Sequence, residues 1–272
     1  MTGNAKNVVI IGGSGGIGRA FVESLAQRED VNSVVATFNR TAPVFSHPAV
    51  SWYKLDITDE AAIRAWTQHL GEIDWLINAA GILHLQDQRP EKSIKQLDPG
   101  FFIQNIKANT LPTLLVAKHL QTHFRHGRPA RFAAVSARVG SIEDNRLGGW
   151  YSYRASKAAL NMCIRTLAIE WRRTLPHVVV AALHPGTTDT TLSQPFQKNV
   201  PREQLFTPAY SVGRMLEVLD KLTPADTGKF WAFDGELLPW SPTLEAVANS
   251  CQHSLQNWLQ SRYLLHKFNL SN

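Results

Sequence analysis

"NVVIIGGSGGIG" occupies Asn7–Gly18 of a chain of 272 residues. Its first half is an apolar run rich in β-branched residues, which is typical of a strand buried in a parallel sheet. Its second half is a glycine loop, and helical spacing follows over residues 17–30. Glycines there let the backbone approach a pyrophosphate, which the N–H groups and dipole of the following helix favour. A flexible turn is the alternative, but the strand–loop–helix position predicts a dinucleotide-binding loop.

Strand-like and helix-like segments alternate from Val8 to about Phe233. This alternation predicts an α/β fold, a doubly wound parallel sheet (Rossmann fold) with helices on both faces. The predicted strands span residues 7–13, 31–40, 51–58, 73–81, 130–140, 177–186 and 228–240. The predicted helices span 17–30, 60–70 and 102–124, the last with Pro112 tolerated or kinking it, and a further helix starts within 148–161.

No linker or repeat divides this pattern, so residues 1–240 are predicted to form one domain. Residues 241–272 add a helical extension, with Ser241 as N-cap and Pro242 at its first position. We expect the extension to pack on its own domain or on a partner subunit, because its apolar residues share one face. These residues are Leu244, Val247, Ala248, Cys251, Leu255, Trp258 and Leu259.

The composition excludes several classes of protein. No apolar run reaches the ~18–20 residues of a membrane span. The first apolar stretch breaks at Gly12, so it is not read as a signal peptide. Two cysteines, Cys163 and Cys251, make no disulfide framework, and a cytoplasmic location is the simplest expectation. Cys163 lies in a helical pattern and is interpreted as a core residue.

The chain is basic, with a net charge of +6 and a pI of about 9.4. The basic residues are scattered and lack interleaved aromatic residues, so we expect no nucleic-acid partner. The charge equally suits a phosphorylated cofactor. His119, His123 and His126 share helical spacing, but no acidic or thiol ligand is near in sequence, so we interpret them as a solvated face and predict no metal.

The end of the second strand, "ATFNR", lacks the acidic residue that holds a ribose 2′-hydroxyl. Arg40 is basic there, and Thr37 and Asn39 can hydrogen-bond a phosphate. This pattern favours NADP(H) over NAD(H). The alternative is that Arg40 is a solvated loop residue.

Several motifs in order resemble the short-chain dehydrogenase/reductase family over about residues 7–240. They are "GGSGGIG", "KLDIT", "NAAG" (Asn78–Gly81), Asn109 in "KANTLPT", "YRASK" and "HPGTTDT". "SARVGSI" and "GELLPW" look most like the branch with the C-factor signalling protein and the sniffer carbonyl reductase. Ile11 and Ala79 replace a usual threonine and asparagine of the family.

The resemblance implies the residues that contact the cofactor, a carbonyl or alcohol as substrate, and a homodimer or homotetramer formed through the helices around Asn109 and Tyr153. The implied cofactor contacts are Gly12, Ser14, Gly16, Ile17, Gly18, Asn39, Arg40, Asp56, Ile57, Asn78, Ala79, Ala80, Gly81, Tyr153, Lys157, Pro185, Gly186, Thr188 and Thr190.

Tyr153 and Lys157 lie four residues apart and so share one helix face, whereas Tyr151 faces elsewhere. A tyrosine has a pKa of about 10, and a nearby lysine cation and an oxidised nicotinamide favour its phenolate. Tyr153 is the predicted proton donor to a carbonyl oxygen. The resemblance implies that Lys157 holds the nicotinamide ribose and that Asn109 positions a water.

The family's serine, which hydrogen-bonds the substrate carbonyl, lies three residues before a glycine. Counting back from Gly140 reaches Ala137 instead. We predict that Ser136 fills this role, although a shift of one residue on a strand turns a side chain to the other face. Ser141 is the second choice, and a site without the serine the third.

The resemblance implies that residues 187–211, which follow the Pro-Gly pair, cover the substrate. Leu192, Phe196, Leu205 and Phe206 make this lid apolar, which suggests a carbonyl substrate with an apolar part. The predicted function is an NADP(H)-dependent carbonyl reductase or alcohol dehydrogenase. The alternative is a cofactor-binding regulatory protein with little turnover.

Overall fold

A computed structural model describes residues 5–85 and 88–240. Eight strands form one sheet in the order β10-β9-β6-β5-β4-β1-β2-β3, and every neighbouring pair is parallel except β9 and β10. The predicted doubly wound sheet is thereby confirmed. The strands are β1 (Lys6–Ile11), β2 (Val31–Phe38), β3 (Val50–Lys54), β4 (Trp75–Asn78), β5 (Ala130–Val135), β6 (Val178–His184), β9 (Lys229–Ala232) and β10 (Leu237–Leu238).

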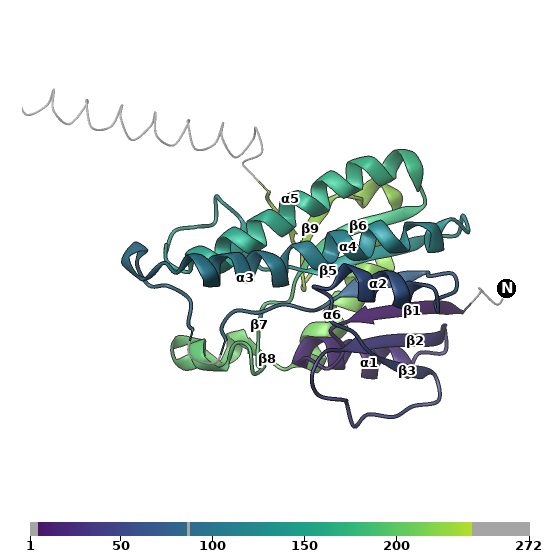
Figure 1. Ribbon diagram of the computed structural model, residues 1–272, viewed down its shortest axis with the longest axis horizontal. Helices are drawn as coiled ribbons and strands as arrows, with labels where there is room; N and C mark the ends of the chain where they lie inside the picture. Colours follow the sequence, from purple (N-terminus) through teal and green to yellow (C-terminus); the bar gives the residue numbers. More distant parts are fainter. Residues whose placement is uncertain (1–4, 86–87, 241–272) are drawn as a thin grey trace, which may run out of the picture.

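Helices cover both faces of the sheet (Figure 1). Side chains of α2, α4 and α5 pack into the core on one face, and those of α1 and α6 into the core on the other. Short 3₁₀ turns and a two-stranded ladder, β7 (Thr187–Thr188) with β8 (Leu205–Phe206), complete the described part. The helices are α1 (Gly16–Ala26), α2 (Glu60–Thr67), α3 (Pro99–Asn109), α4 (Leu111–Leu120), α5 (Tyr151–Thr174) and α6 (Pro208–Lys221). The 3₁₀ turns are η1 (Ile94–Gln96), η2 (Gln121–Phe124), η3 (Arg138–Gly140), η4 (Gln194–Asn199), η5 (Arg202–Gln204) and η6 (Pro224–Asp226).

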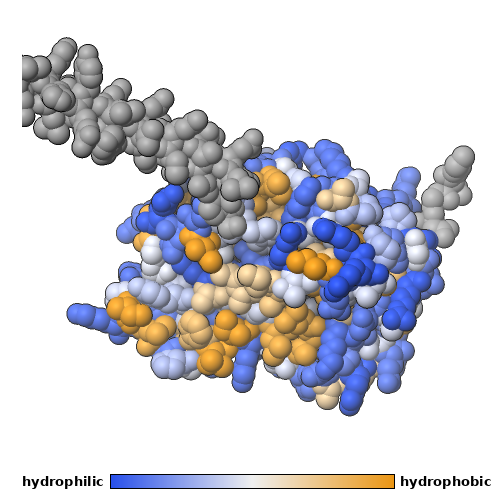
Figure 2. Space-filling model, turned by 90° about the horizontal axis from the view of Figure 1, so that it is seen from above, coloured by the Kyte–Doolittle hydropathy of each residue, from blue (hydrophilic) through white to orange (hydrophobic). Residues whose placement is uncertain are grey.

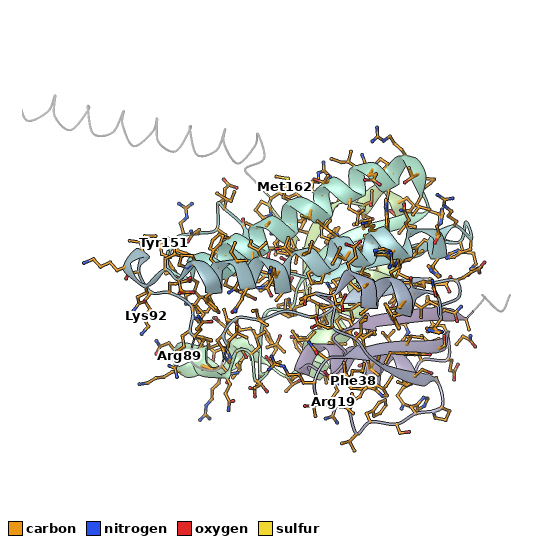
Figure 3. All side chains as sticks on the ribbon, viewed as in Figure 1. Arg19, Phe38, Arg89, Lys92, Tyr151 and Met162 are labelled. Atoms are coloured by element: carbon orange, nitrogen blue, oxygen red, sulfur yellow. The ribbon has the colours of Figure 1, made fainter. Side chains whose placement is uncertain are left out.

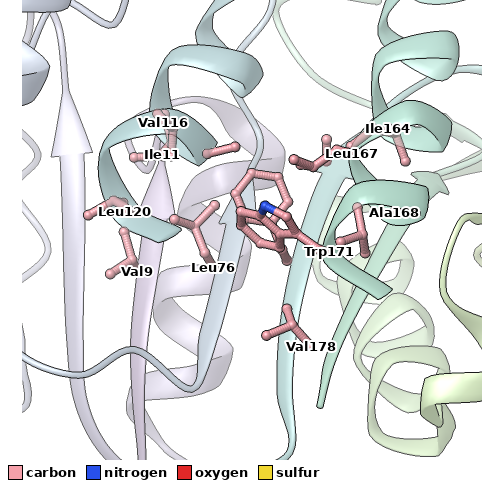
Figure 4. Close-up of a cluster of buried hydrophobic side chains, with 14 of the residues drawn as sticks. Val9, Ile11, Leu76, Val116, Leu120, Ile164, Leu167, Ala168, Trp171 and Val178 are labelled. Atoms are coloured by element: carbon pink, nitrogen blue, oxygen red, sulfur yellow. The ribbon is translucent and has the colours of Figure 1, made fainter. Parts of the chain in front are cut away.

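Trp171 is central to the core beneath α5 (Figure 4). Its ring lies 5.2 Å from that of Phe132 on β5 and 5.7 Å from that of Phe124, between ring centroids. All three side chains are almost fully buried. Burial of such large rings is worth several kcal/mol, on the order of 3–5 for each truncation to alanine. The helix that carries Tyr153 is therefore held firmly on the sheet.

The strand order reverses between β1 and β4, since the chain runs outward through β2 and β3 before it returns to β4. In doubly wound sheets the crevice at such a reversal, beyond the carboxyl ends of the strands, is where ligands bind. The glycine loop after β1 and the segment after β4 both end there.

Two helices differ from the sequence prediction. The long helix expected over residues 102–124 is broken at Thr110 into α3 and α4, because Pro112 has no N–H to donate to the preceding turn, and its end is the 3₁₀ turn η2. Helix α6 was not predicted. Its signals are present in the sequence: the Thr207 side chain accepts from the Tyr210 N–H at 3.2 Å, Pro208 begins the helix, and buried residues recur at helical spacing from Val212 to Leu219.

No helix among the described residues has the length and apolar character to cross a membrane. The helical extension predicted over residues 241–272 lies outside the described residues, as does its predicted packing.

Candidate active site

The glycine loop makes a tight turn between β1 and α1. Gly12 has a φ of +74°, and its N–H donates to Thr37 Oγ1 at 3.1 Å. A Cβ on Gly18 would lie 2.1 Å from the Gly12 carbonyl oxygen, so only glycine lets α1 approach the loop. Helix α1 begins at Gly16 with no side-chain cap and no acidic residue in its first turn. Its first N–H groups are thus available to an anion.

A cavity of about 260 Å³ opens beside this loop. Asp56 lines it after β3, with one carboxylate oxygen accepting from the Thr58 N–H at 2.9 Å and hydroxyl at 2.7 Å. Arg40 is exposed and is not among the lining residues. The predicted cofactor residues on its wall are Gly12, Ser14, Asn39, Asp56, Ile57, Ala79, Ala80 and Gly81.

The segment after β4 is held by Asn78, which is 4% exposed. Its Nδ2 donates to Thr113 Oγ1 at 2.8 Å, and its Oδ1 accepts from the Ala80 N–H at 3.1 Å. A Cβ on Gly81 would lie 3.0 Å from Asn109 Oδ1 and 3.5 Å from Lys157 Nζ. The "NAAG" motif therefore brings the glycine loop, α3 and α5 together.

A second cavity, of about 320 Å³, shares Ala79–Gly81 with the first. The segment after β6 forms its opposite wall: Gly186 has a φ of +73°, and a Cβ on Gly16 would meet Thr190 Cγ2 at 2.6 Å. The glycine loop and the "HPGTTDT" segment, two predicted cofactor motifs far apart in the sequence, are thus in contact. Further predicted residues on this wall are Ser136, Tyr153, Lys157, Ile17, Pro185, Gly186, Thr188 and Thr190.

Tyr153 and Lys157 both line the second cavity from α5, with exposed fractions of 8% and 4%. Lys157 Nζ lies 5.8 Å from the Tyr153 ring centroid and donates to the Val135 carbonyl at 3.0 Å. Gly140 lets α5 come this close, since a Cβ there would lie 2.7 Å from the Lys157 backbone carbonyl carbon. Tyr151 is 40% exposed at the start of the helix (Figure 3).

Burial dominates the titration of both groups. It raises the pKa of the Tyr153 hydroxyl and lowers the pKa of Lys157 from 10.5 to about 8. The direction for Tyr153 is opposite to the one that the sequence suggested from the lysine cation. The cause of the raised Tyr153 pKa is desolvation, because burial penalises the charged phenolate.

Asn109 ends α3 at the break before Pro112, and its side-chain amide is fully engaged. Its Nδ2 donates to the Ile82 carbonyl at 2.9 Å and to Ser156 Oγ at 2.9 Å, while its Oδ1 accepts from the Ile82 N–H at 2.7 Å. Because the side-chain amide already has these partners, a water bound by Asn109 would have to donate its hydrogen bond to the backbone carbonyl. Asn109 lies beside the cavities without lining either.

The two serines considered for the carbonyl contact have other partners. Ser136 Oγ donates to Asn161 Oδ1 at 2.6 Å, at a site only 2% exposed. Ser141 Oγ donates to the Pro239 carbonyl at 3.3 Å and does not line the cavity. Ser136 and Ala137 both contribute to the cavity wall. A contact from Ser136 to a substrate would require its hydroxyl to leave Asn161.

Aromatic side chains close the outer end of the cavity. Phe196 lies 5.0 Å from Trp150 and 6.0 Å from His84, and Trp150 lies 6.2 Å from Tyr153, between ring centroids. Leu192 and Phe196 line the cavity as expected of the lid, together with Val200. Leu205 and Phe206 do not line it. They form β8, and the Phe206 ring packs 4.7 Å from that of Phe233.

The cavity wall includes a histidine that was not predicted from the sequence as a site residue. His184 is the last residue of β6, immediately before the Pro185–Gly186 pair. Its place at the carboxyl end of a predicted strand was a signal, because those strand ends border the crevice. Its Nδ1 accepts from the Arg138 backbone N–H at 3.4 Å.

The three histidines after Pro112 contact separate partners. His119 Nε2 bonds Glu60 at 2.9 Å, His123 Nδ1 the Gly71 carbonyl at 2.8 Å, and His126 Nε2 the Ile73 carbonyl at 2.9 Å. They tie α4 and η2 to neighbouring segments, and within residues 5–85 and 88–240 they belong to no group with metal-binding geometry.

Comparison with known proteins shows which family this fold and sequence resemble. A family model described as short chain dehydrogenase matches residues 6–201. The 1-hydroxy-2-glutathionyl-2-methyl-3-butene dehydrogenase of Rhodococcus sp. (strain AD45) is 29% identical over 246 residues, 86% of this chain and 100% of that protein. The C-signal protein of Myxococcus xanthus is 34% identical over 170 residues, 62% of this chain and 94% of that protein.

Among solved structures, an NADPH-bound carbonyl reductase from chicken fatty liver is 27% identical, with a TM-score of 0.75. The match covers 87% of this chain and 100% of that one. The predicted resemblance, including its carbonyl-reductase-like and C-signal-like branch, is confirmed.

Proposed function

The chain belongs to the short-chain dehydrogenase family of oxidoreductases, and we propose that it is an NADP(H)-dependent enzyme that interconverts a carbonyl compound and its alcohol. One observation carries the proposal: Tyr153 and Lys157 are buried side by side on the wall of a cavity that joins the glycine-loop cavity at Ala79–Gly81. A reacting group and a cofactor can meet there.

The residues of the first cavity fit a dinucleotide. The uncapped start of α1 suits a pyrophosphate, and the absence of a Cβ at Gly12 and Gly18 lets the loop pack closely on Ala80 and on α1. Ser14, Asn39 and Asp56 offer polar groups to the adenosine end. When bound, the nicotinamide cofactor supplies or accepts the hydride.

The chain's own residues handle the proton. In reduction, Tyr153 holds a proton on its hydroxyl and delivers it to the carbonyl oxygen, since burial keeps the phenol protonated. Lys157, held by the Val135 carbonyl, orients the ribose and supplies the charge that favours the phenolate once the proton has left. The Asn109 backbone carbonyl is proposed to hold a relay water. Ser136 as the donor to the carbonyl stays a prediction, and its bond to Asn161 opposes it.

The wall of the second cavity suggests the substrate class. Leu83, Val139, Trp150, Leu192 and Phe196 make it predominantly apolar and aromatic. We propose a carbonyl compound with an aromatic or apolar body. NADP(H) is proposed because no acidic residue follows β2 and because the chicken carbonyl reductase carries NADPH.

The test is turnover of aromatic aldehydes and ketones, followed by NADPH absorbance. Tyr153→Phe should lower kcat at least ~100-fold, because proton transfer contributes about 10²–10⁴ to the rate. Its affinity for NADPH should remain within about threefold, since the ring still packs in the wall. Tyr151→Phe is the matched control and should retain the wild-type rate.

Tight NADPH binding without turnover over a broad carbonyl panel would instead favour a regulatory protein, the activity class suggested by the C-factor-like branch. A Tyr153→Phe variant as active as wild type would contradict the proposed role of Tyr153 as the proton donor.

A further inference from the structure

Some hydrogen-bond donors on the cavity wall around Tyr153 have an acceptor within the described residues, and others do not. Lys157 donates to the Val135 carbonyl, Ser136 to Asn161 and Ser193 to the Thr188 carbonyl. Within the described residues, four donor side chains of the cavity wall have no partner: the Tyr153 hydroxyl, His184 Nε2, the Trp150 indole and the Thr187 hydroxyl. Thr187 is exposed to solvent, and the Trp150 ring packs against Phe196 at the outer end.

His184 lines the cavity from the end of β6, beside the strand whose Val135 carbonyl accepts from Lys157. Strands β5 and β6 pair with Val135 opposite Leu183, and the Ser136 N–H donates to the Leu183 carbonyl at 2.7 Å. His184, the residue after Leu183, therefore lies one position beyond the pair of Val135 and Leu183. The Val135 carbonyl of that pair accepts the hydrogen bond from Lys157. Pro185 and Gly186, on the other side of His184, also line this cavity.

The backbone around His184 assigns its tautomer. A backbone N–H can only donate, so Nδ1, which faces the Arg138 N–H, is the acceptor. The ring proton of the neutral imidazole must then be on Nε2. His184 accordingly presents a donor at Nε2.

His184 is also kept neutral. Burial first, and then the neighbouring Arg138 cation, lower its pKa from 6.5 to about 4, with Asp234 acting in the opposite direction. Arg138 is itself paired with Glu236 at 2.9 Å. A neutral imidazole donates a hydrogen bond without competing with Tyr153 as the proton source.

We propose that His184, through Nε2–H, donates a hydrogen bond to the substrate's carbonyl oxygen, next to the proton donor Tyr153; this inference rests on the proposed carbonyl–alcohol activity. Ala137 has no hydroxyl to offer there, and the Ser136 proton is directed to Asn161. Donors aimed at an oxygen that gains negative charge stabilise the transition state more than the ground state.

Two substitutions separate this role from a structural one. In His184→Asn, the shorter side chain can still accept from the Arg138 N–H but does not reach the position of Nε2. In His184→Gln, the amide N–H lies at about the same reach as Nε2. With NADPH and 4-nitrobenzaldehyde, we expect His184→Asn to lower kcat roughly 100- to 1,000-fold, with KM changed by less than about threefold, as for loss of one oxyanion donor. The kcat of His184→Gln should be at least about tenfold higher than that of His184→Asn.

His69→Asn, at an exposed histidine just after the end of α2, is the matched control and should match wild type. Ser136→Ala is the rival variant and should lose less than about fivefold. A larger loss in Ser136→Ala than in His184→Asn, or equal losses in the Asn and Gln variants of His184 with intact circular dichroism, would overturn the proposal.

A measurement without cofactor keeps the inference separate from the proposed activity. In ¹⁵N NMR of the full chain at pH 7, His184 should be neutral with its proton on Nε2, and acetophenone that shifts the Trp150 indole signal should also shift the His184 Nε2–H. A proton on Nδ1, or a Trp150 shift with none at His184, would overturn the inference. If wild type reduces no carbonyl with either cofactor but the His184 signals behave as expected, only the proposed activity fails.

Discussion

At the scale of residues, burial decides the protonation states of the site. Tyr153, Lys157 and His184 all lie in the same cavity wall, and for each the desolvation of the charged form is the largest influence on its pKa. Such perturbed groups gathered in one cleft are typical of functional sites. The site without cofactor therefore holds a neutral phenol, a neutral imidazole and a destabilised ammonium.

The free-energy cost of burying the charged Lys157 side chain can be measured, because it makes the stability of the fold depend on pH. Its folded pKa of about 8 lies below the unfolded value of 10.5, so the folded state is fully penalised below pH 8. The penalty is relieved as the pH rises from 8 to 10.5, where the unfolded chain still binds the proton. Lys157→Met should therefore raise the free energy of unfolding at pH 7 by roughly 2–3 kcal/mol, which is the pKa difference at ~1.4 kcal/mol per pKa unit less about 1 kcal/mol for the hydrogen bond lost to Val135.

Urea denaturation of wild type and Lys157→Met at pH 7 and pH 10 tests this prediction. The difference between the two proteins should shrink at pH 10. A difference that is independent of pH would mean that the lysine is not desolvated in the folded chain. Lys95→Met, at an exposed position, is the control and should leave stability unchanged at both pH values.

Arg40 carries the prediction on cofactor choice. Its side chain is exposed at the end of β2, next to Asn39 on the cavity wall, and can turn toward a 2′-phosphate. Arg40→Ala should weaken NADPH binding by roughly 1.5–3 kcal/mol, the value of a hydrogen bond to a charged group, and leave NADH binding nearly unchanged. Calorimetric titration with both cofactors measures this. Equal losses for the two would contradict the assignment.

At the scale of elements, the start of α5 is anchored from a distant segment. Trp150, which precedes the helix, has a φ of +53° and caps it with no side-chain bond. Glu91 replaces the missing cap: its carbonyl accepts from the Trp150 N–H at 2.5 Å, and its carboxylate accepts from the Ser152 N–H at 3.2 Å and from the Ser152 hydroxyl. A carboxylate at a helix N-terminus also interacts favourably with the helix dipole. Glu91 thereby holds the turn that positions Tyr153.

Glu91→Gln should destabilise the fold by about 1–3 kcal/mol, since the amide loses the charge-assisted bonds and leaves a buried group poorly paired. Differential scanning calorimetry should record a lower Tm, and kcat should fall more than the affinity for NADPH. Glu203→Gln, at an exposed position, supplies the comparison and should leave Tm within a degree or so. An unchanged Tm in Glu91→Gln would show that the carboxylate does not hold the helix.

At the scale of the whole molecule, the outer faces of α3 and α5 carry apolar side chains that no described residue covers. Ile103 is 51% exposed on α3, and Met162 and Ile169 are 67% and 48% exposed on α5. Figure 2 views the molecule from above Figure 1, where α5 lies, and shows hydrophobic groups set among hydrophilic ones. The sequence resemblance implied a dimer through the helices around Asn109 and Tyr153, and these are the same two helices. We propose that a second copy of the chain covers this face.

A double variant, Ile103→Glu with Met162→Glu, should convert the assembly to a monomer, because like charges would be buried together in a symmetric interface. Sedimentation velocity on the full chain measures the change. Val44→Glu with Leu147→Glu places the same charges at other exposed apolar sites and should not alter assembly. A wild type that sediments as a monomer would dismiss the interface.

The alternation of strands and helices around a parallel sheet and the identity of the site motifs follow from the sequence by itself. β-branched runs, helical spacing and the glycine loop are local signals, so they specify β1, α1 and the return strands without knowledge of distant contacts. Tyr153 with Lys157 is of the same kind, since positions four apart share a helix face whatever surrounds them.

The tertiary structure alone decided how those groups behave. The direction of the Ser136 hydroxyl depends on Asn161, 25 residues later, and the tautomer of His184 depends on the Arg138 N–H of a neighbouring loop. The raised pKa of Tyr153 comes from burial by segments remote in sequence. Hydrogen-bond direction and desolvation are properties of the assembled surroundings, and a residue's neighbours in the chain do not determine them.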